Sequence, residues 1–272
     1  MKFFIGKWLA ALTIVYLSWA GLMAVNQEKL IFFPSSGVME IPHPSGVEIN
    51  EVSFRTPDGE TLHGYFSPAK DSDETIVFFH GNAGNVSGRV GRVSMLNKLK
   101  KNILIFDYRG FGLSTGEIQL EEDLYIDGTA AINFLTEEKK LPVKKMVFWG
   151  RSLGGGVAVE MAKRFNNSKL ILESTFSKLN ELALEKFPVA KLLPKFLIKY
   201  KFENETKIKK ISEPVLIMHS KTDEVIPFSH SEKLFEAAND PKKFVEISGS
   251  HNGSVSTSGA KIFKTVEDFL AE

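Results

Sequence analysis

The sequence predicts an α/β fold with a mostly parallel central sheet that is flanked by helices. Two observations carry this prediction. From residue 75 onward, short apolar runs alternate with longer helical stretches, and the apolar runs lack the polar alternation of half-exposed strands. The chain also has 272 residues, 43% of them hydrophobic and 25% charged, a composition that suits one globular domain with a buried core.

Charge and cysteine content exclude several classes of function. Lysine and arginine total 34 against 33 aspartate and glutamate, so the sequence gives no sign of a nucleic-acid-binding surface. The chain has no cysteine, which excludes disulfides, thiolate metal sites, cysteine nucleophiles and lipidation through cysteine. The six histidines are scattered and no H-E-x-x-H occurs. We therefore expect no metal and no cofactor.

Residues 1–25 predict an N-terminal transmembrane helix. The segment from Trp8 to Val25 has 18 residues without a charge. At about 1.5 Å per residue it is roughly 27 Å long as a helix, close to the roughly 30 Å of a hydrocarbon core. Lys2 and Lys7 precede it, so we expect the N-terminus in the cytoplasm and the rest of the chain on the other side. The alternative is a signal peptide cleaved near Ala20, which would give a secreted protein.

The chain between this helix and the sheet predicts a connector and then a hairpin. Residues 26–46 contain Pro34, Pro42 and Pro44 and form the expected connector, and residues 47–272 form the expected main domain. The first two strands are expected at residues 47–55 and 62–66, joined by a Pro-Asp-Gly turn, as an antiparallel edge of the sheet.

The remaining elements follow from hydrophobic periodicity. Non-alternating apolar runs of three to five residues predict buried parallel strands, and longer stretches with helical periodicity predict the covering helices. The expected strands are residues 75–79, 103–106, 146–149, 170–172, 215–218 and 244–247, and the expected helices are residues 90–99, 121–137, 157–165, 231–238 and 261–270.

Residues 175–206 interrupt this alternation and predict a small helical cap. No strand pattern occurs there, and Pro188 and Pro194 divide the segment into short helical pieces. A long excursion in a compact domain is usually functional, often as a lid. Lysines alternate with leucine, isoleucine and phenylalanine in this segment. Two interpretations remain open: an apolar face packed on the domain with solvated lysines, or a surface that touches an anionic bilayer.

The residues from Gly150 to Gly154 predict a nucleophilic serine. This G-x-S-x-G sequence follows an apolar strand and precedes a helical pattern, which is the context of a serine on a sharp strand-to-helix turn. The strand and the helix pass close together there, so a Cβ at Gly150 or Gly154 would clash. We expect Ser152 to be exposed at the tip of this turn and to act as the nucleophile.

A serine hydroxyl needs a base, and three histidines follow Ser152 in the sequence. In this architecture the order is serine, then acid, then histidine. His251 lies in a glycine- and serine-containing loop directly after the last expected strand, so it is the predicted base. We expect His219, at the end of a strand, to be structural, and His230 begins a helix.

Asp223 is the predicted acid because it follows the strand at residues 215–218 at the same edge of the sheet. Glu224, Asp240 and Glu173 are the alternatives. The first two are more typical of solvated surface carboxylates, whereas Glu173 ends a strand and can point toward the site.

The developing oxyanion requires two backbone N–H donors. Leu153 follows the nucleophile directly and supplies one. The loop that begins at His80, after the strand at residues 75–79, supplies the other through Asn82, with Ala83 as the alternative. We expect His80 to brace this loop, because it precedes the serine and closes a strand.

These motifs together resemble the α/β-hydrolase superfamily. The resemblance rests on residues 80–85 (HGNAGN), residues 107–114 (DYRGFGLS), the sequence around Ser152, and Asp223 and His251, and it extends from about residue 31 to the C-terminal end. Within the superfamily the chain is similar to membrane-anchored hydrolases labelled serine-aminopeptidase-like. The resemblance implies an α/β-hydrolase fold and a catalytic triad of Ser152, Asp223 and His251.

The predicted function is a serine hydrolase that cleaves a carboxylic ester or thioester through an acyl-enzyme on Ser152. Its expected partners are a small-molecule or acylated substrate and a membrane that holds the N-terminal helix. Two alternatives remain open. The same three residues serve an amidase or peptidase, and a hydrolase fold without catalysis serves as a binding protein at the membrane.

Overall fold

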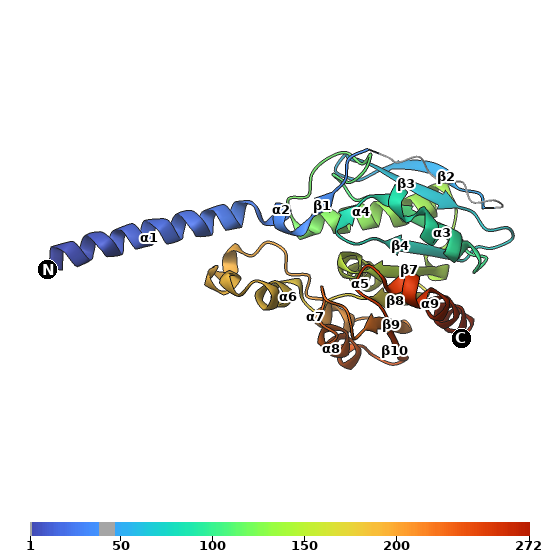
Figure 1. The fold of residues 1–272 in the computed structure, drawn as a ribbon. Coiled ribbons are helices and arrows are strands. Elements are labelled where there is room, and N and C mark those ends of the chain that lie inside the picture. Colours follow the sequence, from blue (N-terminus) through green and yellow to red (C-terminus); the bar gives the residue numbers. More distant parts are fainter. Residues whose placement is uncertain (1, 38–46) are drawn as a thin grey trace.

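The molecule consists of one projecting helix and a body built on a central sheet (Figure 1). The computed structural model describes residues 2–37 and 47–272. Helix α1 (Lys2–Val25) is the expected N-terminal helix, and its segment Lys7–Val25 is long and apolar enough to cross a membrane. Only 6% of that segment is buried, so it is not a core helix.

The body contains an eight-stranded sheet in the order β10-β9-β8-β7-β4-β6-β3-β2. Strands β2 and β3 pair antiparallel, β3 pairs antiparallel with β6, and all other neighbours are parallel. The mostly parallel sheet with an antiparallel edge is therefore confirmed. The strands are β2 (Asn50–Arg55), β3 (Thr61–Ser67), β4 (Thr75–Phe79), β6 (Asn102–Phe106), β7 (Met146–Arg151), β8 (Lys169–Glu173), β9 (Val215–Ser220) and β10 (Lys242–Ile247).

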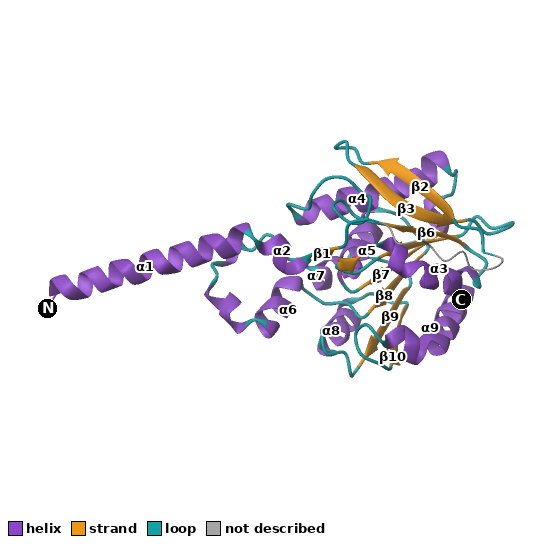
Figure 2. Ribbon diagram, turned by 45° about the horizontal axis from the view of Figure 1, so that its top comes forward, coloured by secondary structure: helices purple, strands orange, loops and turns teal. Residues whose placement is uncertain are grey.

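Helices cover both faces of this sheet (Figure 2). The apolar residues of α4, α5, α7 and α8 join one buried cluster, and those of α3 and α9 join the other. The helices of the body are α3 (Val90–Asn97), α4 (Glu121–Asn133), α5 (Leu153–Arg164), α6 (Leu179–Lys186), α7 (Asn204–Ile208), α8 (Ser229–Ala237) and α9 (Ser254–Ala271).

Strand β4 shows why the central strands lack polar alternation. Its successive side chains point to opposite faces. Val77 and Phe79 belong to one cluster, Ile76 and Phe78 to the other, and all four are buried. A strand covered by helices on both faces has no solvent-facing position, which explains the continuous apolar runs.

Two helices begin four or more residues earlier than their sequence patterns predict. Helix α5 begins at Leu153 rather than at residue 157, and α9 begins at Ser254 rather than at residue 261. Glycine is a poor helix former, so three consecutive glycines hide the start of α5 in the sequence. They fit because other chain segments lie against them: a Cβ at Gly155 would meet Thr175 Oγ1 at 2.2 Å, and one at Gly156 would meet Phe202 at 2.5 Å.

The first part of the expected connector is ordered and packs on the body. It forms α2 (Gln27–Ile31) and strand β1 (Phe33–Pro34), which pairs with β5 (Ala83–Gly84) in a small two-stranded sheet. Phe32 is buried against Tyr200, with ring centroids 5.1 Å apart. The connector positions 38–46 lie outside the described residues.

The segment expected as a cap contains α6, two short 3-10 helices and α7. The 3-10 helices, Pro188–Leu192 and Lys195–Leu197, lie on either side of Pro194. Figures 1 and 2 show α6 and these turns beside the end of α1 that enters the body. The Tyr16 hydroxyl donates to the Leu192 carbonyl at 2.9 Å, and the Gln27 side chain donates to the Leu197 carbonyl at 2.6 Å. The cap segment thus contacts both the projecting helix and the connector.

Candidate active site

Ser152 occupies a strained turn between β7 and α5. Its φ of 54° and ψ of −122° are uncommon for a residue other than glycine. The flanking glycines permit this turn, as expected. A Cβ at Gly150 would lie 2.4 Å from the Gly154 carbonyl oxygen, and one at Gly154 would lie 2.0 Å from the Phe79 carbonyl oxygen. Both partners are backbone atoms, so no side-chain movement relieves the clash.

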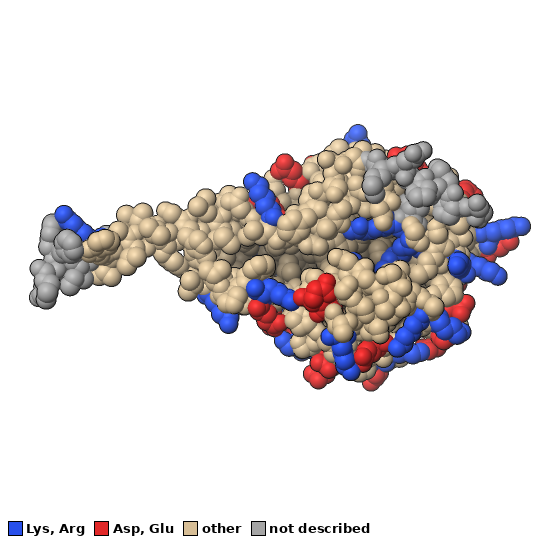
Figure 3. Space-filling view, in the orientation of Figure 1, with Lys and Arg blue, Asp and Glu red and all other residues tan. Residues whose placement is uncertain are grey.

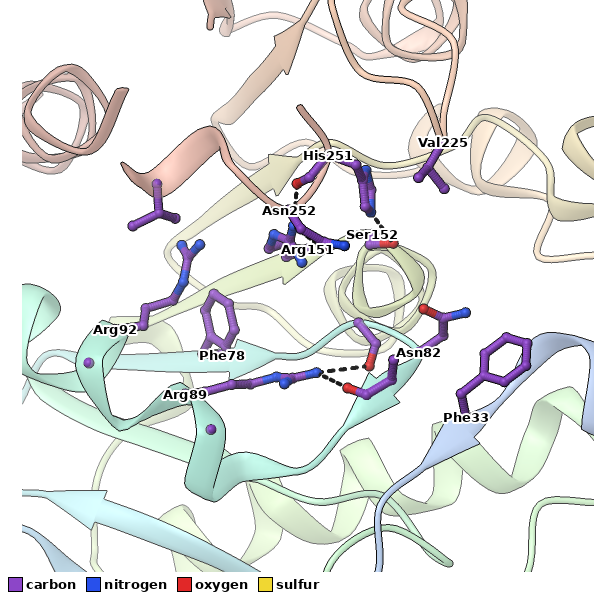
Figure 4. Close-up of a pocket in the computed structure, with 15 residues that line it drawn as sticks. Phe33, Phe78, Asn82, Arg89, Arg92, Arg151, Ser152, Val225, His251 and Asn252 are labelled. Carbon is purple, nitrogen blue, oxygen red and sulfur yellow. Dashed lines mark hydrogen bonds between the residues drawn. The ribbon is translucent and has the colours of Figure 1, made fainter. Parts of the chain in front are cut away.

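The structure brings Ser152, His251 and Asp223 into one hydrogen-bonded row. His251 Nε2 lies 3.1 Å from Ser152 Oγ (Figure 4), and His251 Nδ1 lies 2.7 Å from Asp223 Oδ2. The three residues follow β7, β10 and β9, whose carboxyl ends lie at the same edge of the sheet. All three are at least nine-tenths buried, so Ser152 faces a cavity and does not have the exposed position that the sequence predicts.

Asp223 is held as a carboxylate. Its Oδ1 accepts hydrogen bonds from the backbone N–H groups of Val225 and Ile226 at 2.9 and 2.8 Å. Burial alone would raise its pKa, but hydrogen bonds from His219, His251 and the Ile226 N–H hold the pKa of Asp223 well below its usual range. An ionised Asp223 accepts the Nδ1 proton of His251, which leaves Nε2 free to accept from the serine hydroxyl.

The alternative acids take other roles. Glu173 is fully buried and accepts two hydrogen bonds from Arg92, at 2.8 and 3.0 Å, and one from the Trp149 indole. Glu224 accepts the backbone N–H of His251 at 2.9 Å and so fixes the histidine loop. Asp240 is exposed and precedes β10, at the opposite edge of the sheet.

The other histidines within residues 47–272 are buried, and His219, His230 and His80 have hydrogen-bond partners other than the serine hydroxyl. His219 Nε2 lies 3.0 Å from the Ile226 carbonyl and 3.3 Å from Asp223 Oδ2, so it packs directly against the acid. His230 Nδ1 pairs with the Ser177 hydroxyl at 2.8 Å. His80 Nδ1 donates to the Gly81 carbonyl at 2.7 Å, which fits the expected bracing of the loop after β4.

The two positions expected to supply oxyanion donors border Ser152. Leu153 is the first residue of α5, and the N–H groups of a first helical turn have no acceptor within the helix. Asn82 follows Gly81, at which a Cβ would lie 3.3 Å from Ser152 Cβ. Asn82 is fixed by the connector: its carbonyl accepts the Phe33 N–H at 2.8 Å, and its side chain donates to the Ile31 carbonyl at 2.8 Å.

A cavity opens over the hydrogen-bonded row of Ser152, His251 and Asp223 (Figure 4). Its volume of about 610 Å³ lies within the usual size range of small-molecule sites. Ser152 and His251 line it. Within residues 2–37 and 47–272, no group of three or more histidine, aspartate or glutamate side chains is placed to hold a metal ion. The other lining residues are Phe33, Phe78, Gly81, Asn82, Ala83, Gly88, Arg89, Gly91, Arg92, Arg151, Val225, Asn252 and Val255.

Comparison with known families identifies the kind of protein that carries this site. A family model described as serine aminopeptidase, S33, matches residues 70–213, which contain Ser152 and the loop of Asn82. The chain belongs to the α/β-hydrolase superfamily. Family membership makes it a hydrolase, and the predicted fold class is confirmed.

Relatives of this hydrolase match along most of its length. The chain is 33% identical to the uncharacterized protein YfhR of Escherichia coli K12, over 84% of this chain and 82% of that protein. It is 30% identical to protein bem46 of Schizosaccharomyces pombe, over 96% of this chain and 90% of the relative. It is also 30% identical to the alpha/beta hydrolase domain-containing protein WAV2 of Arabidopsis thaliana, over 94% and 91% of the two chains.

Solved structures share the fold at low identity. An esterase from Pyrococcus furiosus superposes with a TM-score of 0.76 at 18% identity, over 89% of this chain and 97% of the esterase. The esterase domain of a Rhodothermus marinus protein superposes with a TM-score of 0.62 at 21% identity, over 82% and 97%. These matches establish the architecture of the hydrolase.

Three parts of the site escaped the sequence analysis. Arg89, Arg92 and Arg151 line the cavity but lie in three different elements, and no motif groups them. The connector residues that hold Asn82 show only a short apolar run in the sequence. His219 was expected to be structural, and its place against Asp223 depends on the bend of the loop that follows β9.

Proposed function

We propose that this hydrolase cleaves carboxylic esters or thioesters through an acyl-enzyme on Ser152. The observation that carries the proposal is the row of hydrogen bonds from Ser152 Oγ through His251 to Asp223 at the edge of a cavity. This arrangement is the one that activates a serine hydroxyl on several unrelated folds. The strained φ of Ser152 supports the proposal, because such strain concentrates at functional sites.

In the proposed mechanism, His251 takes the proton of Ser152 as the hydroxyl attacks the acyl carbon. Asp223 holds the Nδ1–H tautomer and stabilises the imidazolium that forms. The backbone N–H groups of Leu153 and Asn82 donate to the developing oxyanion. His251 then protonates the leaving group, and water, deprotonated by the same histidine, releases the acyl group from Ser152.

A fluorophosphonate probe tests this proposal, because it labels serines activated in this way. We expect the wild-type protein to be labelled and Ser152→Ala to be unlabelled. Ser212→Ala, which removes an exposed serine away from the cavity, serves as the matched control and should be labelled like the wild type. A folded wild-type protein that neither reacts with the probe nor hydrolyses any ester would instead favour the binding-protein alternative.

An amidase or peptidase with the same triad is the second candidate, because the matching family model is described as a serine aminopeptidase. Two solved structures with the same fold are esterases, and this favours ester cleavage over amide cleavage. Initial rates on p-nitrophenyl esters, thioesters and aminoacyl p-nitroanilides of matched acyl length separate the two. Faster turnover of the anilides would overturn the ester assignment.

We further propose that α1 anchors the hydrolase in a membrane with its body on the non-cytoplasmic side. The apolar segment Lys7–Val25 is almost entirely exposed, and Lys2 and Lys7 lie at its N-terminal end. The contact of Tyr16 with the cap segment favours an uncleaved helix, because cleavage near Ala20 would remove it. Recovery of the chain from culture medium without its first 20 or so residues would favour the signal-peptide alternative instead.

A further inference from the structure

Three arginines line the cavity beside the proposed nucleophile. Arg89 precedes α3, Arg92 lies one turn later on α3, and Arg151 directly precedes Ser152. Figure 4 shows all three on the same side of Ser152, and Figure 3 shows blue side chains inside the hollow of this face. Charged side chains are costly to bury, so their convergence on one cavity calls for a negatively charged partner.

The acidic groups at this site do not balance the arginines. Among the described residues, Glu173 is the one carboxylate paired with the cluster, through Arg92 at 2.8 Å and Arg151 at 3.5 Å. Asp223 is a second carboxylate whose charge acts on Arg151, so three guanidinium groups face two carboxylates. Burial raises the pKa of the nearby Asp107 to about 7, so it adds at most part of a third negative charge. Burial and the charge of Arg151 lower the pKa of Arg89 to about 10, which reflects the same surplus.

Arg89 and Arg151 also keep donors that no described group uses. Arg89 donates through Nη1 and Nη2 to the carbonyls of Asn85, Gly81 and Ala83, and its Nε–H has no acceptor within residues 2–37 and 47–272. Arg151 donates through Nη2 to the His251 carbonyl and to Asn252, and its Nη1 lies 3.8 Å from the Cβ position of Gly81. Both guanidinium groups are fixed by backbone carbonyls, which preorganises their free edges.

The opposite side of the cavity is apolar. Phe33 and Val225 lie on the other side of Ser152 from the arginines (Figure 4), and they are 53% and 41% exposed. A neutral acyl ester would use the apolar side and leave the arginines unpaired. A ligand with one apolar part and one anionic part satisfies both sides.

We propose that the substrate carries an anionic group, a carboxylate or a phosphate, that binds between Arg89 and Arg151 while its apolar part lies against Phe33 and Val225. The inference rests on the proposed function, because it places the scissile bond at Ser152 between the two parts. Arginine suits this task, since its planar donors match the oxygens of both anions.

Two matched pairs of substrates test this inference by turnover. The carboxylate pair is mono-p-nitrophenyl glutarate and p-nitrophenyl valerate, which differ in a terminal carboxylate against a methyl group. The phosphate pair is 1-octanoylglycerol 3-phosphate and 1-octanoylglycerol. We expect the wild type to prefer the anionic member of one pair by at least about tenfold in kcat/KM, and the preferred pair identifies the anion. Equal kcat/KM within both pairs would overturn the inference and leave the proposed hydrolase in place.

The variant Arg89→Gln should reduce that preference toward one, because it removes the charge and keeps part of the hydrogen bonding. Arg55→Gln removes the same charge from an exposed position on β2, outside the cavity, and should keep the wild-type preference. The preference should also fall as salt is raised, because the site opens to solvent. A ratio unchanged in Arg89→Gln would contradict the role of this arginine.

A binding experiment separates this inference from the proposed chemistry. Isothermal titration of Ser152→Ala with the four intact esters measures recognition without turnover. We expect the anionic member of the preferred pair to bind at least about tenfold more tightly than its neutral partner, and the difference to be lost in Ser152→Ala with Arg89→Gln. Failure of probe labelling with this binding difference intact would end the proposed chemistry alone, whereas equal binding would end the anion site alone.

Discussion

At the scale of single residues, Asp223 is held more firmly than an orienting carboxylate requires. Two backbone N–H groups bind Oδ1, while His251 and His219 lie at 2.7 and 3.3 Å from Oδ2. All of these groups donate hydrogen bonds to Asp223. An asparagine at this position would therefore lose the negative charge and would also point its NH₂ group, itself a donor, at other donors. The bracing therefore selects a carboxylate and one tautomer of His251.

We predict that Asp223→Asn lowers kcat by about a thousandfold or more, because the amide no longer holds the His251 tautomer that accepts from Ser152. Pre-steady-state and steady-state rates of ester hydrolysis measure this loss of kcat. Asp240→Asn, at the far edge of the sheet, is the control and should retain wild-type kcat. A loss of tenfold or less would show that Asp223 does not orient the base.

Asp107 has a different environment, because it is fully buried beneath the loop of Asn82 and has little to compensate its charge. Its Oδ1 accepts the Val86 N–H at 2.9 Å, and its Oδ2 has no hydrogen-bond partner among the described residues. Burial raises its pKa to about 7. The folded state therefore binds a proton more tightly than the unfolded chain, so folding stability falls as pH rises from near the ordinary carboxyl pKa to about 7.

Asp107→Asn should remove this pH dependence. Relative to the wild type, we expect its free energy of unfolding to rise by as much as about 4 kcal/mol between about pH 4 and about pH 8. Urea denaturation across this range measures the difference. Asp71→Asn removes the same charge from an exposed turn and should follow the wild type. Parallel curves for Asp107→Asn and the wild type would mean that Asp107 stays ionised in the fold.

At the scale of elements, the sequence predicted what hydrophobic periodicity and chain order determine. Every expected strand of the body has a counterpart: the central parallel strands appear as continuous apolar runs, and the antiparallel edge is marked by its turn sequence. Ser152, Asp223 and His251 were identifiable because each lies within four residues of the end of such a strand. Contacts between distant segments were not predictable. The start of α5 and the pairing of Glu173 with Arg92 depend on Thr175, Phe202 and α3, which lie elsewhere in the sequence.

The connector is the element whose role was least predictable. Its Phe33 and Ile31 bind Asn82 through backbone atoms, and such bonds leave no pattern of side-chain types. Through them, the segment that leaves the projecting helix holds the loop of the proposed oxyanion donor. We infer that α2 and β1 belong functionally to the site.

This role predicts different outcomes for two truncations. A chain that begins at Asn26 keeps α2 and β1 and should hydrolyse soluble esters within about twofold of the full-length rate. A chain that begins at Ser36 loses both and should lose at least about a hundredfold in kcat, the usual effect of a missing oxyanion donor. Esterase rates and circular dichroism measure activity and folding together.

A point variant keeps this prediction testable if the shorter chain does not fold. Asn82→Ala removes the hydrogen bond to Ile31 but keeps the backbone amide, and we expect a fall in kcat of about tenfold with little change in KM. Asn239→Ala is the matched control, because it removes a similar hydrogen bond to the Ile211 carbonyl, outside the cavity. Equal activity of the two variants would show that the connector does not position Asn82.

At the scale of the whole molecule, the cap segment lies at a depth that the proposed anchor defines. Tyr16, nine residues before the end of α1, contacts the Leu192 carbonyl. Nine residues of helix span about 14 Å. If α1 crosses a bilayer with its last residue at the outer surface, Tyr16 and the turn at Leu192 lie about 14 Å below that surface, near the middle of a hydrocarbon core of about 30 Å. The exposed apolar side chains there fit this placement: Phe187, Val189, Leu192 and Phe196 are 65%, 53%, 61% and 85% exposed.

We therefore predict that the body retains membrane affinity after α1 is removed. The chain that begins at Asn26 should cosediment with vesicles of phosphatidylcholine and phosphatidylglycerol. Substitution of Leu192 and Phe196 by serine should weaken this binding by at least about tenfold, since each side chain contributes apolar area. Hydrolysis of soluble short-chain esters should not change, because neither residue lines the cavity.

The control is a double variant with serine at Leu113 and Leu120, which are 51% and 54% exposed elsewhere on the body. It should bind the vesicles like the unsubstituted chain. Equal binding by both double variants would place the membrane-facing surface away from the cap, and the cap would then be a solvated lid.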